Sequence, residues 1–166
     1  MKHKKIIVSK YIKEFYEKYK KGHKVNVAKL YYQGVIGFRK AGVKYSYSFE
    51  EMEEWSKCKH DPIYFIEKYC DIFNIGLAKF TKVKLYDYQK ELINNFFKYR
   101  FNITLTSRQT GISTVTCFII LHQLCFESNK NTFYLHDKIF QSVEILNKIK
   151  ELYKRLPYFL KPGVVL

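Results

Sequence analysis

The sequence contains few cysteines, and none of them is spaced as part of a metal site. Cys58 and His60 are separated in the sequence by one residue, but no second pair of ligands follows them. Structural zinc sites need two such pairs, so a zinc site is not expected. Nothing suggests a disulfide framework, which fits a reducing interior. The four cysteines are Cys58, Cys70, Cys117 and Cys125.

Long apolar runs and acidic residues are also scarce. No run approaches the roughly 20 apolar residues of a membrane-spanning helix, and Lys2–Lys5 is not followed by the apolar region of a signal peptide. The chain has 30 Lys and Arg against 15 Asp and Glu, a net charge of +15. Residues 1–44 hold 13 basic and 2 acidic residues, and therefore +11 of that charge. This excess favours a polyanionic partner, most often nucleic acid; the alternative is a solvated basic surface in a lysine-rich proteome.

The first 46 residues are expected to form a basic helical segment. Apolar side chains recur there at helical spacing, and a second helix is expected over Val25–Lys40. The spaced residues of the first helix are Ile12, Phe15, Tyr16 and Tyr19.

Two further helices are predicted from their starting signals. Ser48 and Glu51 form a capping box that opens a helix to about Lys57. Asp61 followed by Pro62 predicts an N-cap and first helical residue, and this helix should end near 74–76.

The stretch Phe101–Glu127 predicts a strand, a polar loop and then an apolar helix. Phe101, Ile103 and Leu105 alternate with polar residues, as in a strand, and a run without Pro or Gly follows from Ser113 to Phe126. A second strand is predicted over Thr132–Leu135, with helices over Leu85–Tyr99 and Phe140–Arg155 on either side. Helices alternating with strands favour a parallel α/β arrangement.

The loop partly matches the phosphate-loop pattern G-x-x-x-x-G-K-[ST]. Gly111 and Ser113 match, whereas Thr106 and Ile112 replace the first Gly and the Lys. Arg108 is then the local cation suited to phosphate oxygens, and the Ser113 hydroxyl is a candidate Mg²⁺ ligand. The alternative is a structural corner in which Gly111 supplies an unusual backbone angle and Ser113 caps the helix.

Upstream of this loop, Gln89 is a candidate reader of a nucleotide base. Its side-chain amide presents both a donor and an acceptor, which suits the adenine edge. Tyr86 or Tyr88 is placed to stack on the base.

Four ordered blocks, DPIYFIEKYC (61–70), LYDYQKELI (85–93), LTSRQTGIST (105–114) and LPYFLKPGV (156–164), resemble the start of the large terminase subunit of tailed bacteriophages. That family packages viral DNA with an N-terminal ATPase domain and a C-terminal nuclease. The resemblance covers most of residues 47–166 and implies a partial RecA-like P-loop NTPase with a parallel sheet, preceded by the helical segment 1–46. It also implies the amino-terminal part only, without the Walker B acid of a third strand or the nuclease domain.

The resemblance implies ATP and Mg²⁺ as cofactors and a role for each loop residue. Tyr88 and Gln89 match the adenine-binding motif, Arg108 matches a cis-acting charge stabiliser with a catalytic role, and Ser113 matches the Mg²⁺-side hydroxyl. The implied partners are double-stranded DNA, the portal protein, the small terminase subunit and the remainder of the terminase chain, in the host cell cytoplasm and without a membrane. The implied nucleotide-binding loop residues are Ser107, Arg108, Gln109, Thr110, Gly111, Ile112, Ser113 and Thr114.

Two other functions stay open at the level of sequence. One is a basic nucleic-acid-binding module in which the loop is only a structural corner. The other is a helicase-like ATPase, because helicases can also combine an upstream Gln with a phosphate loop.

Overall fold

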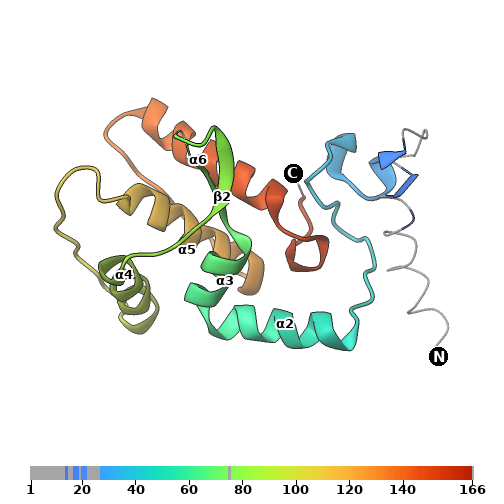
Figure 1. Cartoon of the computed structure of the whole chain (residues 1–166), viewed down its shortest axis with the longest axis horizontal. Helices are drawn as coiled ribbons and strands as arrows, with labels where there is room; N and C mark the ends of the chain where they lie inside the picture. The colour runs from blue at the N-terminus through green and yellow to red at the C-terminus, as the bar shows by residue number, and fades with distance from the viewer. Residues whose placement is uncertain (1–13, 15–16, 19, 22–26, 75, 166) are drawn as a thin grey trace. The chain divides into compact units, whose positions relative to one another are not determined.

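The computed structural model describes residues 14, 17, 18, 20, 21, 27–74 and 76–165 (Figure 1). The chain forms two compact units, residues 1–56 with 157–166, and residues 57–156. The apolar residues of the first predicted helix, Ile12, Phe15, Tyr16 and Tyr19, lie outside the described residues.

The first unit contains short 3₁₀ turns where a helix over Val25–Lys40 was expected, so that prediction is wrong. The turns are η1 (Val27–Lys29) and η2 (Tyr32–Gly34). Gln33 at φ 49° and Gly34 at φ 72° take left-handed backbone conformations that an α-helix does not contain. The chain therefore reverses, and Tyr31 pairs with Arg39 in an antiparallel bridge.

Arg39 holds the first unit together across a long sequence separation. Its guanidinium lies 5.4 Å from the ring centroid of Tyr45 and 5.0 Å from that of Tyr158. It also donates hydrogen bonds to the carbonyls of Lys161 at 3.0 Å and Val43 at 3.2 Å. The turn η3 (Tyr158–Leu160) is thereby fastened to residues 30–45, around a core of Leu30, Tyr31 and Tyr158.

The second unit is built around α5 (Ile112–Phe126), which is apolar on nearly all sides. It contacts α3 (Pro62–Tyr69), α4 (Asp87–Lys98) and α6 (Ile139–Arg155), and Figure 1 shows it running through the middle of this unit. Packing against three neighbouring helices explains why most of its side chains are apolar. Its buried apolar side chains are Val115, Cys117, Phe118, Ile119, Ile120, Leu121 and Phe126.

The predicted helix starts are confirmed. The Ser48 hydroxyl accepts from the N–H of Glu51 at 3.1 Å, and the Glu51 carboxylate accepts from the N–H of Ser48 at 3.0 Å, at the start of α2 (Phe49–His60). Asp61 accepts from the N–H of Tyr64 at 2.9 Å ahead of α3. However, α3 ends at Tyr69, several residues before the predicted end.

The predicted parallel RecA-like sheet is wrong. The described residues are mostly helical, and their one sheet is an antiparallel pair, β1 (Asp71–Asn74) with β2 (Lys79–Lys82). The Asn74 side chain accepts from the N–H of Leu77 at 3.1 Å and closes the connecting turn. The sequence prediction missed this hairpin because it continued the preceding helix through the residues of β1.

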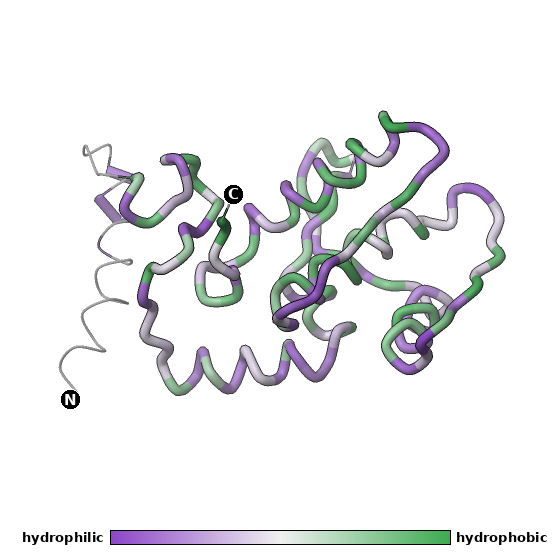
Figure 2. Tube along the Cα trace, turned by 180° about the vertical axis from the view of Figure 1, so that it is seen from behind, coloured by the Kyte–Doolittle hydropathy of each residue, from purple (hydrophilic) through white to green (hydrophobic). Residues whose placement is uncertain are grey.

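The two predicted strands are not formed. Among the described residues, 101–106 and 131–136 make no backbone–backbone hydrogen bonds. Ile103, Leu105, Phe133 and Leu135 are at least 84 % exposed. Alternating apolar residues identify a chain able to pair, but a strand exists only where a neighbour accepts its hydrogen bonds. Figure 2 shows hydrophobic residues along the wide bend between α4 and α5.

Burial raises the pKa of two thiols, Cys70 and Cys117, and lowers that of one histidine in this unit. Burial raises the pKa of Cys117 to about 11, and Cys58, Cys70, Cys117 and Cys125 are all free thiols.

Across the part of the chain that the structure describes, no helix combines the length and apolar character needed to cross a membrane.

His122 lies inside an aromatic cluster on α5 and is only 3 % exposed. Its ring centroid is 5.5 Å from that of Phe65, 5.1 Å from Phe97 and 4.8 Å from Phe126. Its Nε2 lies 3.0 Å from the Cys58 carbonyl oxygen, while its buried Nδ1 makes no hydrogen bond. Burial lowers the pKa of His122, outweighing the hydrogen bond to Cys58 and the Glu127 charge, which act in the opposite direction.

We expect His122 to make the protein less stable in mild acid. Because its pKa is lowered on folding, the unfolded chain binds the proton more readily, so stability is lost as pH falls below about 6.5 toward the folded-state pKa. The measurement is the urea unfolding midpoint at pH 7.5, 6.5 and 5.5. His122→Phe, which keeps an aromatic ring, should show a weaker dependence on pH over that range; an unchanged dependence would assign the effect to other groups.

We expect Asp61→Ala to lower the free energy of unfolding by about 1 kcal/mol, because the first turn of α3 loses its side-chain cap. Asp61→Asn is the matched control, since an Asn side chain retains the acceptor oxygen. Urea unfolding at pH 7.5 compares the three proteins. Equal losses in both variants would show that the charge matters and the cap does not.

Candidate functional site

The loop between 107 and 111 is sharply folded ahead of α5. Gln109 at φ 64° and Gly111 at φ 75° both have left-handed backbone conformations. The Thr110 hydroxyl donates to the Ser107 carbonyl at 3.1 Å and closes the bend. Gly111 occupies the N-cap position of α5, so the helix begins at Ile112. The expectation that Ser113 would cap the helix is therefore wrong, because Ser113 is its second residue.

The start of α5 presents uncapped backbone N–H groups. The N–H groups of Thr114 and Val115 both donate to the Gly111 carbonyl at 3.0 Å, and the N-cap has no side-chain hydrogen bond. Among the described residues, no acceptor is present for the N–H groups of Gly111, Ile112 and Ser113. Unpaired N–H groups at a positive helix end form a favourable position for an anion.

The charge around this corner also suits an anion. The sequence from Phe101 to Phe126 contains no Asp or Glu. Arg108 is exposed and makes no hydrogen bond or ion pair with any residue that the structure describes. Its guanidinium is therefore available to a ligand at the start of α5.

Gln89 on α4 fastens this loop in place. Its Oε1 accepts from the N–H of Tyr86 at 3.1 Å, and its Nε2 donates to the Thr110 carbonyl at 3.2 Å. The Tyr88 hydroxyl donates to the same carbonyl at 2.9 Å. Gln89 is 9 % exposed, and a Cβ added to Gly111 would lie 3.0 Å from its Nε2. Gly111 thus provides both the backbone angle and the space for the Gln89 amide.

The other predicted loop residues lie around the same corner. Ser107, Arg108 and Gln109 are exposed on the bend, and Thr110 is half-buried. On the first turn of α5, Ile112 and Thr114 are half-buried and Ser113 is exposed. The expected Mg²⁺ role of Ser113 involves no ready-made protein site, since the described part of the chain gathers no group of three His, Cys, Asp or Glu suited to a metal.

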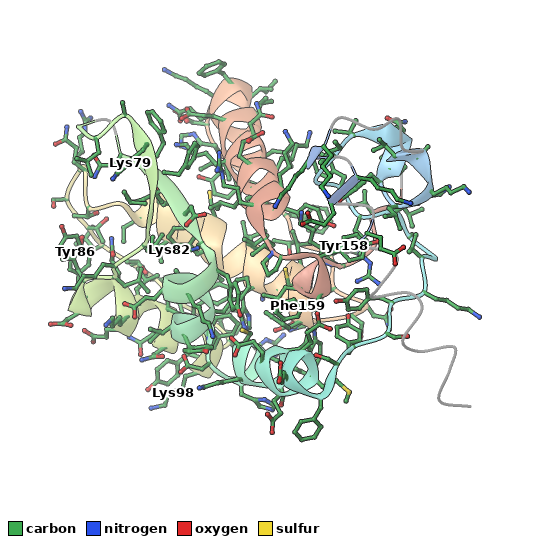
Figure 3. The ribbon with its side chains drawn as sticks, turned by 45° about the vertical axis from the view of Figure 1, so that its right-hand side comes forward. Lys79, Lys82, Tyr86, Lys98, Tyr158 and Phe159 are labelled. Atoms are coloured by element: carbon green, nitrogen blue, oxygen red, sulfur yellow. The ribbon has the colours of Figure 1, made fainter. Side chains whose placement is uncertain are left out.

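Two features beside the loop were not predicted from the sequence. A cavity of about 370 Å³ lies between α4 and residues 102–106, lined in part by Tyr88, Glu91, Asn95 and Ile112. The rings of Tyr86 and Tyr88 stack in parallel with centroids 5.7 Å apart, and Figure 3 shows Tyr86 at the N-terminal end of α4. The spacing of Glu91 and Asn95, four residues apart on one helix, is the only sequence signal that pairs them.

Compared with known protein families, the chain matches no family model.

We expect Gly111→Ala to lower the free energy of unfolding by about 1–2 kcal/mol, because φ 75° is costly for any residue with a Cβ. Gly42→Ala is the matched control, since Gly42 also has φ 75° but a Cβ there would meet nothing within 4 Å. Urea unfolding measures both variants. A clearly larger loss for Gly111→Ala is expected because its Cβ also displaces the Gln89 amide, and equal losses would contradict that contact.

Proposed function

We propose that the corner formed by residues 107–114 binds the triphosphate of a nucleotide, with ATP and Mg²⁺ as the ligands. The observation that carries this proposal is the uncapped start of α5, where three backbone N–H groups have no acceptor among the described residues. Phosphate oxygens fit such a position because they accept several hydrogen bonds and their negative charge is stabilised by the helix end.

In this proposal, each side chain of the corner has a separate role in binding the triphosphate. The Arg108 guanidinium neutralises phosphate charge that Ile112, in the position of the usual lysine, leaves uncompensated. The Ser113 hydroxyl, exposed on the first turn of α5, is a ligand for the Mg²⁺ that accompanies the phosphates. Gln89 and Tyr88 keep the loop in the shape that directs the N–H groups at the ligand.

The wider role that we propose follows from the resemblance to the large terminase subunit. In that role the chain is the ATP-binding part of a motor that moves phage DNA into the prohead, in the host cell cytoplasm. Its partners would be double-stranded DNA, the portal protein, the small terminase subunit and the remainder of the terminase chain. The net charge of +15, concentrated in residues 1–44, supports a polyanionic partner such as DNA.

We expect Arg108→Ala to weaken ATP binding by about tenfold or more, since a charge-assisted hydrogen bond contributes roughly 1.5–3 kcal/mol. Lys138→Ala is the control, because Lys138 is another exposed cation, which lies at the start of α6 and outside the loop. The measurement is titration of the purified chain with MgATP by isothermal calorimetry.

Equal small losses in the two variants would show that Arg108 contributes only general positive charge. No detectable binding of ATP to the unmodified chain at millimolar concentration would overturn the proposed function.

A further inference from the structure

The cavity beside the phosphate corner has the size of a small-ligand site. Its volume of about 370 Å³ lies within the roughly 300–1,000 Å³ of typical ligand pockets. Tyr88 and Ile112 line it, and both belong to the corner, since the Tyr88 hydroxyl bonds to Thr110 and Ile112 begins α5. A nucleotide whose phosphates lie at the start of α5 therefore has a neighbouring cavity for its base.

Gln89 is not available to read that base in this structure. Its Oε1 is bonded to the backbone of Tyr86, and its Nε2 is bonded to the carbonyl of Thr110 at 3.2 Å with the Tyr88 hydroxyl at 3.4 Å. Both hydrogens of the amide nitrogen thus have acceptors within the chain. Reading a base edge would require Gln89 to release the loop that forms the phosphate site.

The polar side chains that remain inside the cavity are of the kind that recognises adenine. Glu91 and Asn95 are four residues apart on α4, so they lie on the same face of the helix. A carboxylate only accepts hydrogen bonds, which suits the exocyclic amine of adenine, and an amide NH₂ donates, which suits a ring nitrogen. Neither side chain makes a hydrogen bond or ion pair with another residue that the structure describes. The ring of Tyr88 supplies an aromatic surface at the edge of the same cavity.

We propose that Glu91 and Asn95 bind the adenine base in the cavity between α4 and residues 102–106, and that Gln89 is a positioning residue that holds the phosphate loop. This proposal rests on the proposed function, because it assigns the base of the nucleotide whose phosphates lie at the corner. It places base recognition two and six residues further along α4 than Gln89, the residue that the sequence indicated.

The experiment compares three ligands by calorimetry in the presence of Mg²⁺: ATP, purine riboside triphosphate and inorganic tripolyphosphate. Purine riboside triphosphate carries hydrogen in place of the exocyclic amine, so we expect it to bind about tenfold more weakly than ATP, by loss of one charge-assisted hydrogen bond. Glu91→Ala should abolish that difference, and Glu91→Gln, which keeps an acceptor oxygen, should restore part of it.

The variants on α4 separate base binding from loop positioning. Asn95→Ala should weaken the binding of ATP and leave the binding of tripolyphosphate unchanged. Asn94→Ala is the control and should alter neither, because Asn94, the preceding residue, is exposed and does not line the cavity. Gln89→Ala should weaken ATP and tripolyphosphate by the same factor, because it disturbs the phosphate loop itself.

Each opposite result overturns a specific step. If Gln89→Ala weakens ATP alone, Gln89 reads the base and the assignment to Glu91 and Asn95 fails. If tripolyphosphate binds the unmodified chain as tightly as ATP, the base makes no contact and the cavity assignment fails while the phosphate site stands. If neither ligand binds, the proposed function and the inference fail together.

Discussion

The hydrogen bonds of the Gln89 side chain are the constraint on which the candidate site depends. They join the first turn of α4 to the carbonyl of Thr110, which lies near the far end of the bend of residues 99–111. A buried amide that lost these partners would be left unsatisfied at a cost of about 1–3 kcal/mol. The bend therefore has one favoured arrangement at its end, although most of its residues are exposed. That arrangement sets the orientation of the start of α5.

The packing of α5 is the second feature on which the candidate site depends. Its apolar side chains are buried against α3, α4 and α6, so its axis is held by packing on several sides. A helix held in this way presents its N-terminal N–H groups in a fixed direction, which is what a phosphate site requires. The two left-handed residues Gln109 and Gly111 turn the loop around that end, and residues 101–126 contain no Asp or Glu.

The first unit shows how a cation can act as a structural centre. The Arg39 guanidinium lies against the rings of both Tyr45 and Tyr158 and donates to two backbone carbonyls. Residues near the end of the chain are thereby tied to residues near its beginning, and Gly163 approaches the Cα of Ala41 so closely that a Cβ would lie 2.7 Å away. Not every basic residue in this lysine-rich chain is therefore available to a polyanion.

Local signals in the sequence determined the helices. The Ser48–Glu51 capping box, the Asp61–Pro62 start and the continuous apolar run after Gly111 identified α2, α3 and α5, because caps and periodicity act over one or two turns. The tertiary structure alone decided the pairing of segments. Alternation in residues 101–106 predicted a strand, yet a strand depends on hydrogen bonds to a distant neighbour, and the described residues provide none. For the same reason the sequence placed Gln89 near the loop but did not reveal that its amide is bonded to Thr110, because that contact depends on how α4 packs beside α5.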